Sequence, residues 1–248
     1  MAVRHEIKSQ LAKLLATEDL IVEHRKVETA SFNVQTRVLV LPQWERASST
    51  VYDLLVGHEV GHALYTPDEN WIKYKKIPPQ FVNVVEDARI EKLMKRKYAG
   101  LSKTFYRGYK ELNDEDFFAI SDSDVTDFNL ADRANLYFKV GNFLDLSFTA
   151  EESEIIKMID DCETFEDTLA AAEALYKYCK QQLEKPKTQP EVPQNDGNME
   201  GDVEETEQGE SEQKESETQM SDGDDGGVSD VDLEVQTADA LEESIQDL

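Results

Sequence analysis

The chain has 248 residues, with 26 basic and 53 acidic side chains, and its formal net charge at pH 7 is −27. No apolar run approaches the ~20 residues of a transmembrane helix, and the N-terminus lacks the apolar core of a secretory signal. Such an acidic chain is poorly suited to bind phosphate backbones, which requires clustered Lys and Arg. We therefore expect a cytoplasmic protein that binds neither membranes nor nucleic acid, with Cys162 and Cys179 as reduced thiols.

The negative charge is concentrated at the C-terminal end. Residues 186–248 contain 21 acidic and 2 basic side chains, a net charge of −19, which leaves −8 for residues 1–185. The C-terminal part has almost no aromatic residues and cannot bury enough apolar surface to offset the entropy lost on folding. The sequence predicts a folded domain over residues 1–185 and a disordered acidic tail over residues 186–248. Residues 237–248 could dock on a partner or on the domain itself, although a frayed terminus is the simpler expectation.

The domain is expected to be α+β. A short helix over 6–16 precedes strand-like runs at 20–27, 30–34 and 36–41, which we interpret as a small antiparallel sheet. Thr50-x-x-Asp53 has the form of a capping box, and it predicts the start of a long helix over 49–65 that Pro67 closes. Further helices are expected at 80–97, 102–112, 130–146, 150–160 and 165–184. Pro78-Pro79 opens the first of these, and Thr149-Ala-Glu-Glu152 is a plausible start for the helix at 150–160.

The most informative segment is His58-Glu-Val-Gly-His62 within the helix over 49–65. Positions i and i+4 lie on one helix face, so His58 and His62 can point two imidazoles at one metal ion. Zinc is the usual metal for paired neutral imidazoles, and we expect one Zn²⁺ per chain. Glu59 follows the first histidine and can reach a water on the metal without binding the metal itself, which suits a general base.

A catalytic zinc site needs a third protein ligand and an open position for water. Glu86 lies 24 residues after His62, which allows a connection and an antiparallel return to the same metal. Asp87 and Glu91 are alternatives on the same helix. Because the helix over 80–97 turns its valine-rich side inward, the sequence favours Glu86, which lies beside that side, over Asp87 about 100° further round.

His58, Glu59, His62 and Glu86 together resemble the gluzincin group of zinc metallopeptidases. This resemblance implies a zincin-like fold, with zinc bound by two helix histidines and a downstream glutamate, and a peptide or protein substrate. The stretch Glu86-Asp-Ala-Arg-Ile-Glu91 departs from the group's pattern, because Ile90 stands where an Asp is expected. It is more similar to poorly characterised phage and bacterial proteins with a metallopeptidase-like region, an acidic linker and a von Willebrand factor A domain related to a cobaltochelatase subunit.

The same resemblance suggests where a substrate would lie. In such peptidases the strand before the active-site helix commonly forms the edge of the cleft, and residues 36–41 occupy that place, although a buried central strand is equally compatible with their sequence. Hydrolysis also needs a donor to the developing oxyanion. Tyr106 and Tyr109 are the favoured donors, and Tyr65, Tyr98 and Arg107 are alternatives.

The expected function is zinc-dependent peptide hydrolysis with Glu59 as the general base. The alternative is a scaffold or assembly protein whose metal fold is structural or relict, and which acts through its acidic tail with an ATPase or an A-domain partner. A third possibility is that the tail mimics nucleic acid. Because longer proteins of similar sequence continue into an A domain, a fragment, a split gene or a shortened form is also expected.

Overall fold

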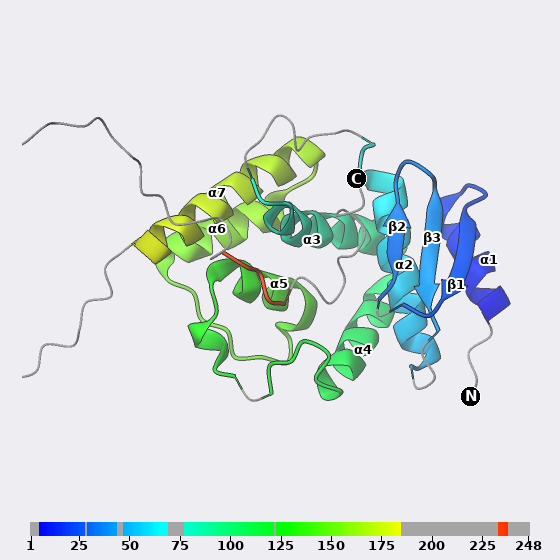
Figure 1. The fold of residues 1–248 in the computed structure, drawn as a ribbon, viewed down its shortest axis with the longest axis horizontal. Coiled ribbons are helices and arrows are strands. Elements are labelled where there is room, and N and C mark those ends of the chain that lie inside the picture. The colour runs from blue at the N-terminus through cyan, green and yellow to red at the C-terminus, as the bar shows by residue number, and fades with distance from the viewer. Residues whose placement is uncertain are drawn as a thin grey trace, which may run out of the picture.

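A three-stranded sheet and a larger helical region build an α+β fold (Figure 1). The structure is a computed structural model that describes residues 5–27, 29–43, 47–68, 77–121, 123–184 and 233–237. The helix α1 (His5–Ala16) and the sheet lie at one end, α2 (Ser49–Tyr65) and α3 (Pro79–Lys97) in the middle, and α6 (Ala150–Asp161) and α7 (Phe165–Glu184) at the other end.

The sheet is mixed, with the order β1-β3-β2. A turn at Asn33, whose Oδ1 accepts hydrogen bonds from the backbone N–H groups of Gln35 and Thr36, joins two antiparallel strands. The second strand of this hairpin inserts beside the first strand of the chain and runs parallel to it, so the prediction of a fully antiparallel sheet was wrong. The strands are β1 (Ile21–Arg25), β2 (Ser31–Asn33) and β3 (Val38–Pro42).

The strand expected to form the edge of a substrate cleft is the central strand of the sheet. The β3 strand pairs with β1 on one side and β2 on the other, so its backbone groups are used within the sheet. The edges are β1 and β2, and β2 and β3 both contact α2. An extended peptide would therefore have to pair with another strand than β3.

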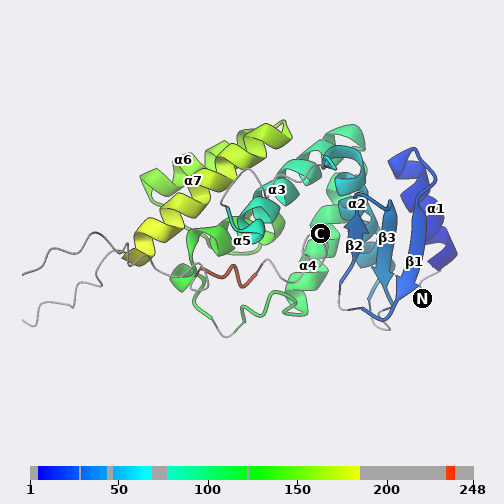
Figure 2. The ribbon, with the colours of Figure 1, turned by 45° about the horizontal axis from the view of Figure 1, so that its top comes forward.

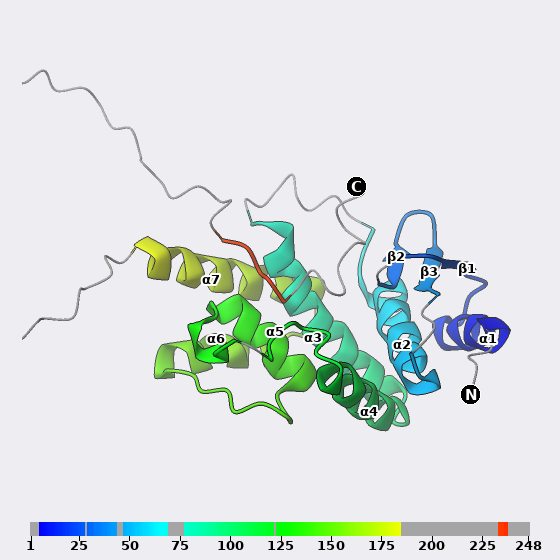
Figure 3. The same cartoon turned by 60° about the horizontal axis from the view of Figure 1, so that its bottom comes forward.

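The helix α2 is buried on almost every side, from Val51 to Ala63, except at Asp53. The sheet and α1 cover one side, and α3 and α4 (Leu101–Asp114) cover the other (Figure 3). Lys8 of α1 donates a 2.5 Å hydrogen bond to Asp53 and thereby ties the two helices together. A helix that is apolar all round needs such enclosure, because it has no face suited to water.

The helical half packs on the far side of α3 (Figure 2). The prediction of a helix over 130–146 was too long, because α5 (Leu130–Val140) ends at Val140. The apolar residues after Gly141 pack instead on the core that α1, the sheet, α2 and α4 form. The expected helix start at Thr149 is confirmed, and Thr149 and Glu152 form a capping box there; Cys162 and Cys179 are buried free thiols. The remaining elements here are α5 (Leu130–Val140) and the short 3₁₀ helix η2 (Val125–Asp127).

Part of the acidic tail belongs to this half of the molecule. Residues 233–237 lie against α5, with Leu233 and Val235 buried, which differs from the expectation of a tail that is disordered throughout. The rest of residues 186–248, including all but the first residue of the proposed terminal docking segment, lies outside the described residues. Among the described helices, none has both the length and the apolar character needed to cross a membrane.

Candidate metal centre

The N-cap residue Ser48 sets the start of the helix that carries the two histidines. Its Oγ accepts hydrogen bonds from the backbone N–H groups of Thr50 and Val51, at 3.1 and 3.2 Å. The proposed capping box at Thr50 and Asp53 is therefore wrong, since the N-cap lies two residues before Thr50, although α2 begins at Ser49 as predicted. Glu111 of α4 accepts a 2.7 Å hydrogen bond from the Ser48 hydroxyl and fixes this end of α2.

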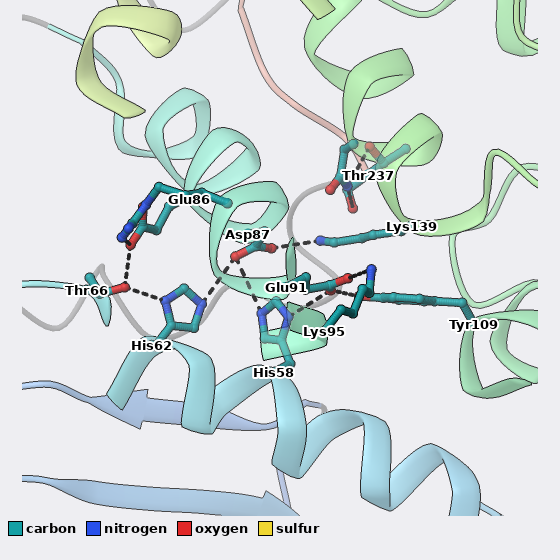
Figure 4. Close-up of polar contacts among 12 residues, drawn as sticks. His58, His62, Thr66, Glu86, Asp87, Glu91, Lys95, Tyr109, Lys139 and Thr237 are labelled. Carbon is teal, nitrogen blue, oxygen red and sulfur yellow. Dashed lines mark hydrogen bonds and ion pairs between the residues drawn. The ribbon is translucent and has the colours of Figure 1, made fainter. Parts of the chain in front are cut away.

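His58, His62 and Asp87 converge at the contact between α2 and α3 (Figure 4). Nε2 of His58 lies 3.4 Å from Oδ1 of Asp87, and Nε2 of His62 lies 3.2 Å from the same oxygen. The ligand atoms of a tetrahedral zinc site with bonds of about 2.0 Å are about 3.3 Å apart. The three side chains offer donor atoms that all lie within 4.8 Å of one another, so they could hold a metal ion.

The structure places Asp87, not Glu86, beside the histidines. Glu86 points to the adjacent side of α3, where Arg89 donates two hydrogen bonds to it, at 2.8 and 2.6 Å. Thr66 and Thr168 also donate to its carboxylate, at 2.6 and 3.0 Å. The prediction of Glu86 as the third ligand was thus out of phase by one residue, because the Glu86 carboxylate is already used to join α2, α3 and α7.

Both imidazoles are held through Nδ1, which leaves Nε2 directed at the centre. Nδ1 of His58 lies 3.1 Å from Oε1 of Glu91, and Nδ1 of His62 lies 3.0 Å from the hydroxyl of Thr66. Because the Thr66 hydroxyl donates to Glu86, it accepts from His62. A carboxylate or hydroxyl on the second nitrogen fixes the tautomer and the orientation of a metal-binding histidine. Glu86 therefore supports His62 through Thr66.

The pairs between α2 and α3 also define how the helices run. From His58 to His62 to Thr66 along α2, the partners on α3 are Glu91, Asp87 and Glu86. The order is reversed, which confirms the antiparallel return of the second helix. Gly61 lies at this contact, because a Cβ atom there would be 3.1 Å from Cδ1 of Ile90, and the absence of one allows α3 to approach closely.

The electrostatics of the centre are those of a buried cluster of opposite charges. Lys139 of α5 donates a 2.8 Å hydrogen bond to Oδ2 of Asp87. Burial acts to raise the pKa of Asp87, but Lys139 and His58 outweigh it and hold that pKa well below its ordinary value. Burial likewise acts to lower the pKa of His58, but Asp87 and Glu91 raise that pKa to about 10. In the metal-free protein a proton on His58 therefore supplies part of the positive charge that this site requires.

Glu59 is a buried carboxylate that interacts electrostatically with both histidines. Its side chain is buried, and neither carboxylate oxygen has a hydrogen-bond partner within the described part of the chain. Burial raises the pKa of Glu59, and the positive charges of His58, His62 and Lys139 oppose that shift. A buried carboxylate without a partner is costly and is characteristic of a functional site. Its electrostatic interactions with His58, His62 and Asp87 show that it lies near the cluster.

The two favoured oxyanion donors, Tyr106 and Tyr109, have different surroundings. Tyr106 is half exposed, and its ring packs on Phe143 at 5.1 Å. Tyr109 is buried, and its hydroxyl donates a hydrogen bond to Oε1 of Glu91, the same oxygen that contacts Nδ1 of His58. Burial and the charge of Glu91 raise the pKa of Tyr109 well above its ordinary value, which keeps this hydroxyl protonated as a donor.

The alternative donors are also placed elsewhere or remain unassigned. Tyr98 donates a hydrogen bond to the backbone carbonyl of Leu15, at 2.6 Å, and Arg107 is exposed on α4. Tyr65 ends α2 near the cluster, and its carbonyl accepts a 2.9 Å hydrogen bond from Arg89.

Sequence reasoning missed Lys139 and Thr66 altogether. Lys139 comes from α5, 52 residues after Asp87, and no local pattern links the two. Asp87 and Glu91 did carry a signal, because two carboxylates at i and i+4 on one helix match two histidines at i and i+4 on another.

In comparisons with known proteins, no family model matches the sequence, and no curated protein or solved structure matches it.

Proposed function

We propose that this chain is a zinc-dependent hydrolase of peptide bonds, with His58, His62 and Asp87 as the metal ligands and Glu59 as the general base. Two imidazoles and one carboxylate form a ligand set typical of catalytic zinc, which keeps a fourth position open. The resemblance to gluzincins supports the roles of His58, Glu59 and His62 on α2. The third ligand departs from that group, because it is an aspartate one residue after the expected glutamate.

The observation that carries the proposal is the buried carboxylate of Glu59, to which the described residues donate no hydrogen bond. A zinc ion, when bound, polarises a carbonyl oxygen and lowers the pKa of water towards 7. Glu59 takes the proton from the attacking water and later delivers it to the leaving amine. Lys139 holds Asp87 by one oxygen, while Glu91 and Thr66 hold the imidazoles. The chain's own residues thus fix the geometry before a substrate arrives.

A metal-stabilised scaffold is the second candidate, and the burial of the cluster favours it. His62 is the most exposed of the four side chains, at 8%. A scaffold needs no access for a peptide, whereas a hydrolase does. In this alternative the acidic tail binds the partner, and a structural zinc would normally be closed by a fourth protein ligand.

The two functions are separated by comparing the wild-type chain with Glu59→Gln on a panel of unstructured peptides, at equal zinc occupancy. Because Glu59 is not a ligand, the variant should keep its zinc and its fold. A hydrolase should lose about 10²–10⁴-fold in rate when the base is removed. Equal cleavage by both chains would indicate a contaminating protease and contradict the assignment of Glu59, and no cleavage by either would favour the scaffold.

A further inference from the structure

A short segment of the acidic tail packs against the helical half. Residues 233–237 have the sequence Leu-Glu-Val-Gln-Thr, and their side chains alternate between buried and exposed. Leu233, Val235 and Thr237 are no more than 3% exposed. The two apolar side chains enter the cluster that contains Phe81 of α3 and Leu130 of α5. The alternation is that of a bound peptide which presents every second side chain to its receptor.

Side chains of the helical half also bind the backbone of the segment. Gln80 donates to the carbonyl of Leu233 at 3.1 Å, and Asn129 donates to the carbonyl of Glu234 at 3.0 Å. These two amides come from the start of α3 and from the N-cap of α5. Contacts to backbone carbonyls fix the position and direction of a peptide whatever its side chains are.

Thr237 is recognised more specifically than the other residues. Its backbone N–H and its hydroxyl both donate to Oδ1 of Asp132, at 2.7 and 2.9 Å. Asn135 donates to its carbonyl at 2.8 Å and to its hydroxyl at 3.1 Å. Asp132 and Asn135 are themselves 1% exposed, so these bonds are made away from water. A valine at this position would lose the two buried hydrogen bonds of the hydroxyl, to Asp132 and from Asn135, whereas a serine would keep both.

The segment is separated from the folded domain by a long stretch of sequence. Residues 185–232, 48 in all, lie between the end of α7 and Leu233. The entropy cost of closing a loop grows only slowly with its length, so the distance in sequence does not prevent binding within the same chain. Binding within one chain is intramolecular, and its effective concentration is set by the length of the connection, which lets modest contacts favour the bound segment.

We propose that residues 233–237 are an exchangeable, tethered peptide ligand, and that α3 and α5 form a recognition groove for an apolar-x-apolar-x-Thr sequence. The bound segment braces α5, the helix that also carries Lys139. Asp132 and Lys139 are seven residues apart, two helical turns, and so lie on one side of α5. Figure 4 shows Thr237 beyond Lys139, and Lys139 reaching Asp87. This proposal does not depend on hydrolysis by the metal centre.

The test uses the full chain and a fluorescein-labelled peptide of residues 230–240. In a Leu233→Asp/Val235→Asp chain the resident segment should leave the groove, because carboxylates would have to be buried among apolar side chains. This chain should bind the labelled peptide at least tenfold more tightly than the wild-type chain, whose own segment competes. The full chain with Thr237→Val, which adds no charge, should also take up the peptide better than the wild type.

Peptide variants and a groove variant show whether binding is specific. A Thr237→Val peptide should bind at least tenfold more weakly than a Thr237→Ser peptide, and Asn135→Ala in the Leu233→Asp/Val235→Asp chain should weaken binding of the wild-type peptide. Equal binding of the two peptides, equal binding by the wild-type and Leu233→Asp/Val235→Asp chains, or no binding to either chain would overturn the proposal. Global unfolding of the Leu233→Asp/Val235→Asp chain would also overturn it, because the segment would then be a fixed part of the core.

Discussion

Lys139 and Asp87 form a buried ion pair in which the two carboxylate oxygens of Asp87 have different partners. Lys139 Nζ donates to Oδ2 of Asp87, and Oδ1 of Asp87 is left facing Nε2 of both histidines. Both side chains are no more than 4% exposed. The lysine therefore balances a charge that would otherwise be costly to bury, and it restricts Asp87 to one oxygen for a metal.

Replacement of Lys139 by Met should destabilise the metal-free protein strongly. Removal of one partner from a buried pair leaves an uncompensated charge, which typically costs about 3–5 kcal/mol of unfolding free energy. Zinc should restore part of this loss, because it supplies positive charge at the same carboxylate and binds the native state. Urea unfolding in chelator and in zinc measures both effects. Lys177→Met is the matched control, since Lys177 pairs with Glu173 at the surface and should change stability by less than about 1 kcal/mol.

Asp87→Asn should weaken zinc binding more than Glu86→Gln. Asp87 faces the metal centre directly, whereas Glu86 acts through Thr66. Loss of a supporting partner typically costs about 10–100-fold in metal affinity, and loss of a ligand should cost more. Titration calorimetry of zinc into the two metal-free variants gives the comparison. If the Glu86→Gln chain fails to bind zinc and the Asp87→Asn chain binds it normally, the third ligand is Glu86 and not Asp87.

The stability of the metal-free protein should fall as the pH rises through the alkaline range. The pKa of His58 is raised from 6.5 to about 10 in the folded protein, so protonated His58 stabilises the native state. This contribution is fully present below pH 6.5 and is lost as the pH rises towards about 10. With zinc bound the imidazole is already deprotonated, so the slope should be smaller.

Chemical unfolding at several pH values in chelator and in saturating zinc measures this difference. His58→Gln is the control, because it should remove the alkaline loss in chelator while leaving the other titrating groups in place. Parallel pH profiles with and without zinc would show that zinc binding does not involve His58.

Much of the local structure could be predicted because its signals are local. The bounds of α2 and α7, and the capping box at Thr149, follow from helical periodicity and the residues that begin and end helices. The pairing of His58 with His62 likewise depends only on the helical repeat. The order of strands in the sheet cannot be predicted from local signals, because β3 inserts between two strands that precede it in the chain.

The choice of Asp87 over Glu86 as the residue beside the histidines also depends on long-range contacts. A 100° step separates Glu86 from Asp87 on α3, and the sequence alone does not fix which side of the helix meets α2. The side is set by long-range packing, in which Gly61 fits against Ile90 and Arg89 turns Glu86 towards α7. A valine-rich side also faces a second core of α5 to α7, so the apolar pattern indicated burial without indicating against which helix.

The most direct test of the metal centre is a crystal structure of the full chain, equilibrated with zinc, with anomalous scattering measured at the zinc edge. The account predicts one peak bounded by Nε2 of His58, Nε2 of His62 and Oδ1 of Asp87, at about 2.0–2.2 Å from each. Glu59 should lie outside the coordination sphere. The absence of a peak between these atoms, or a zinc ion held by Glu86, would contradict it.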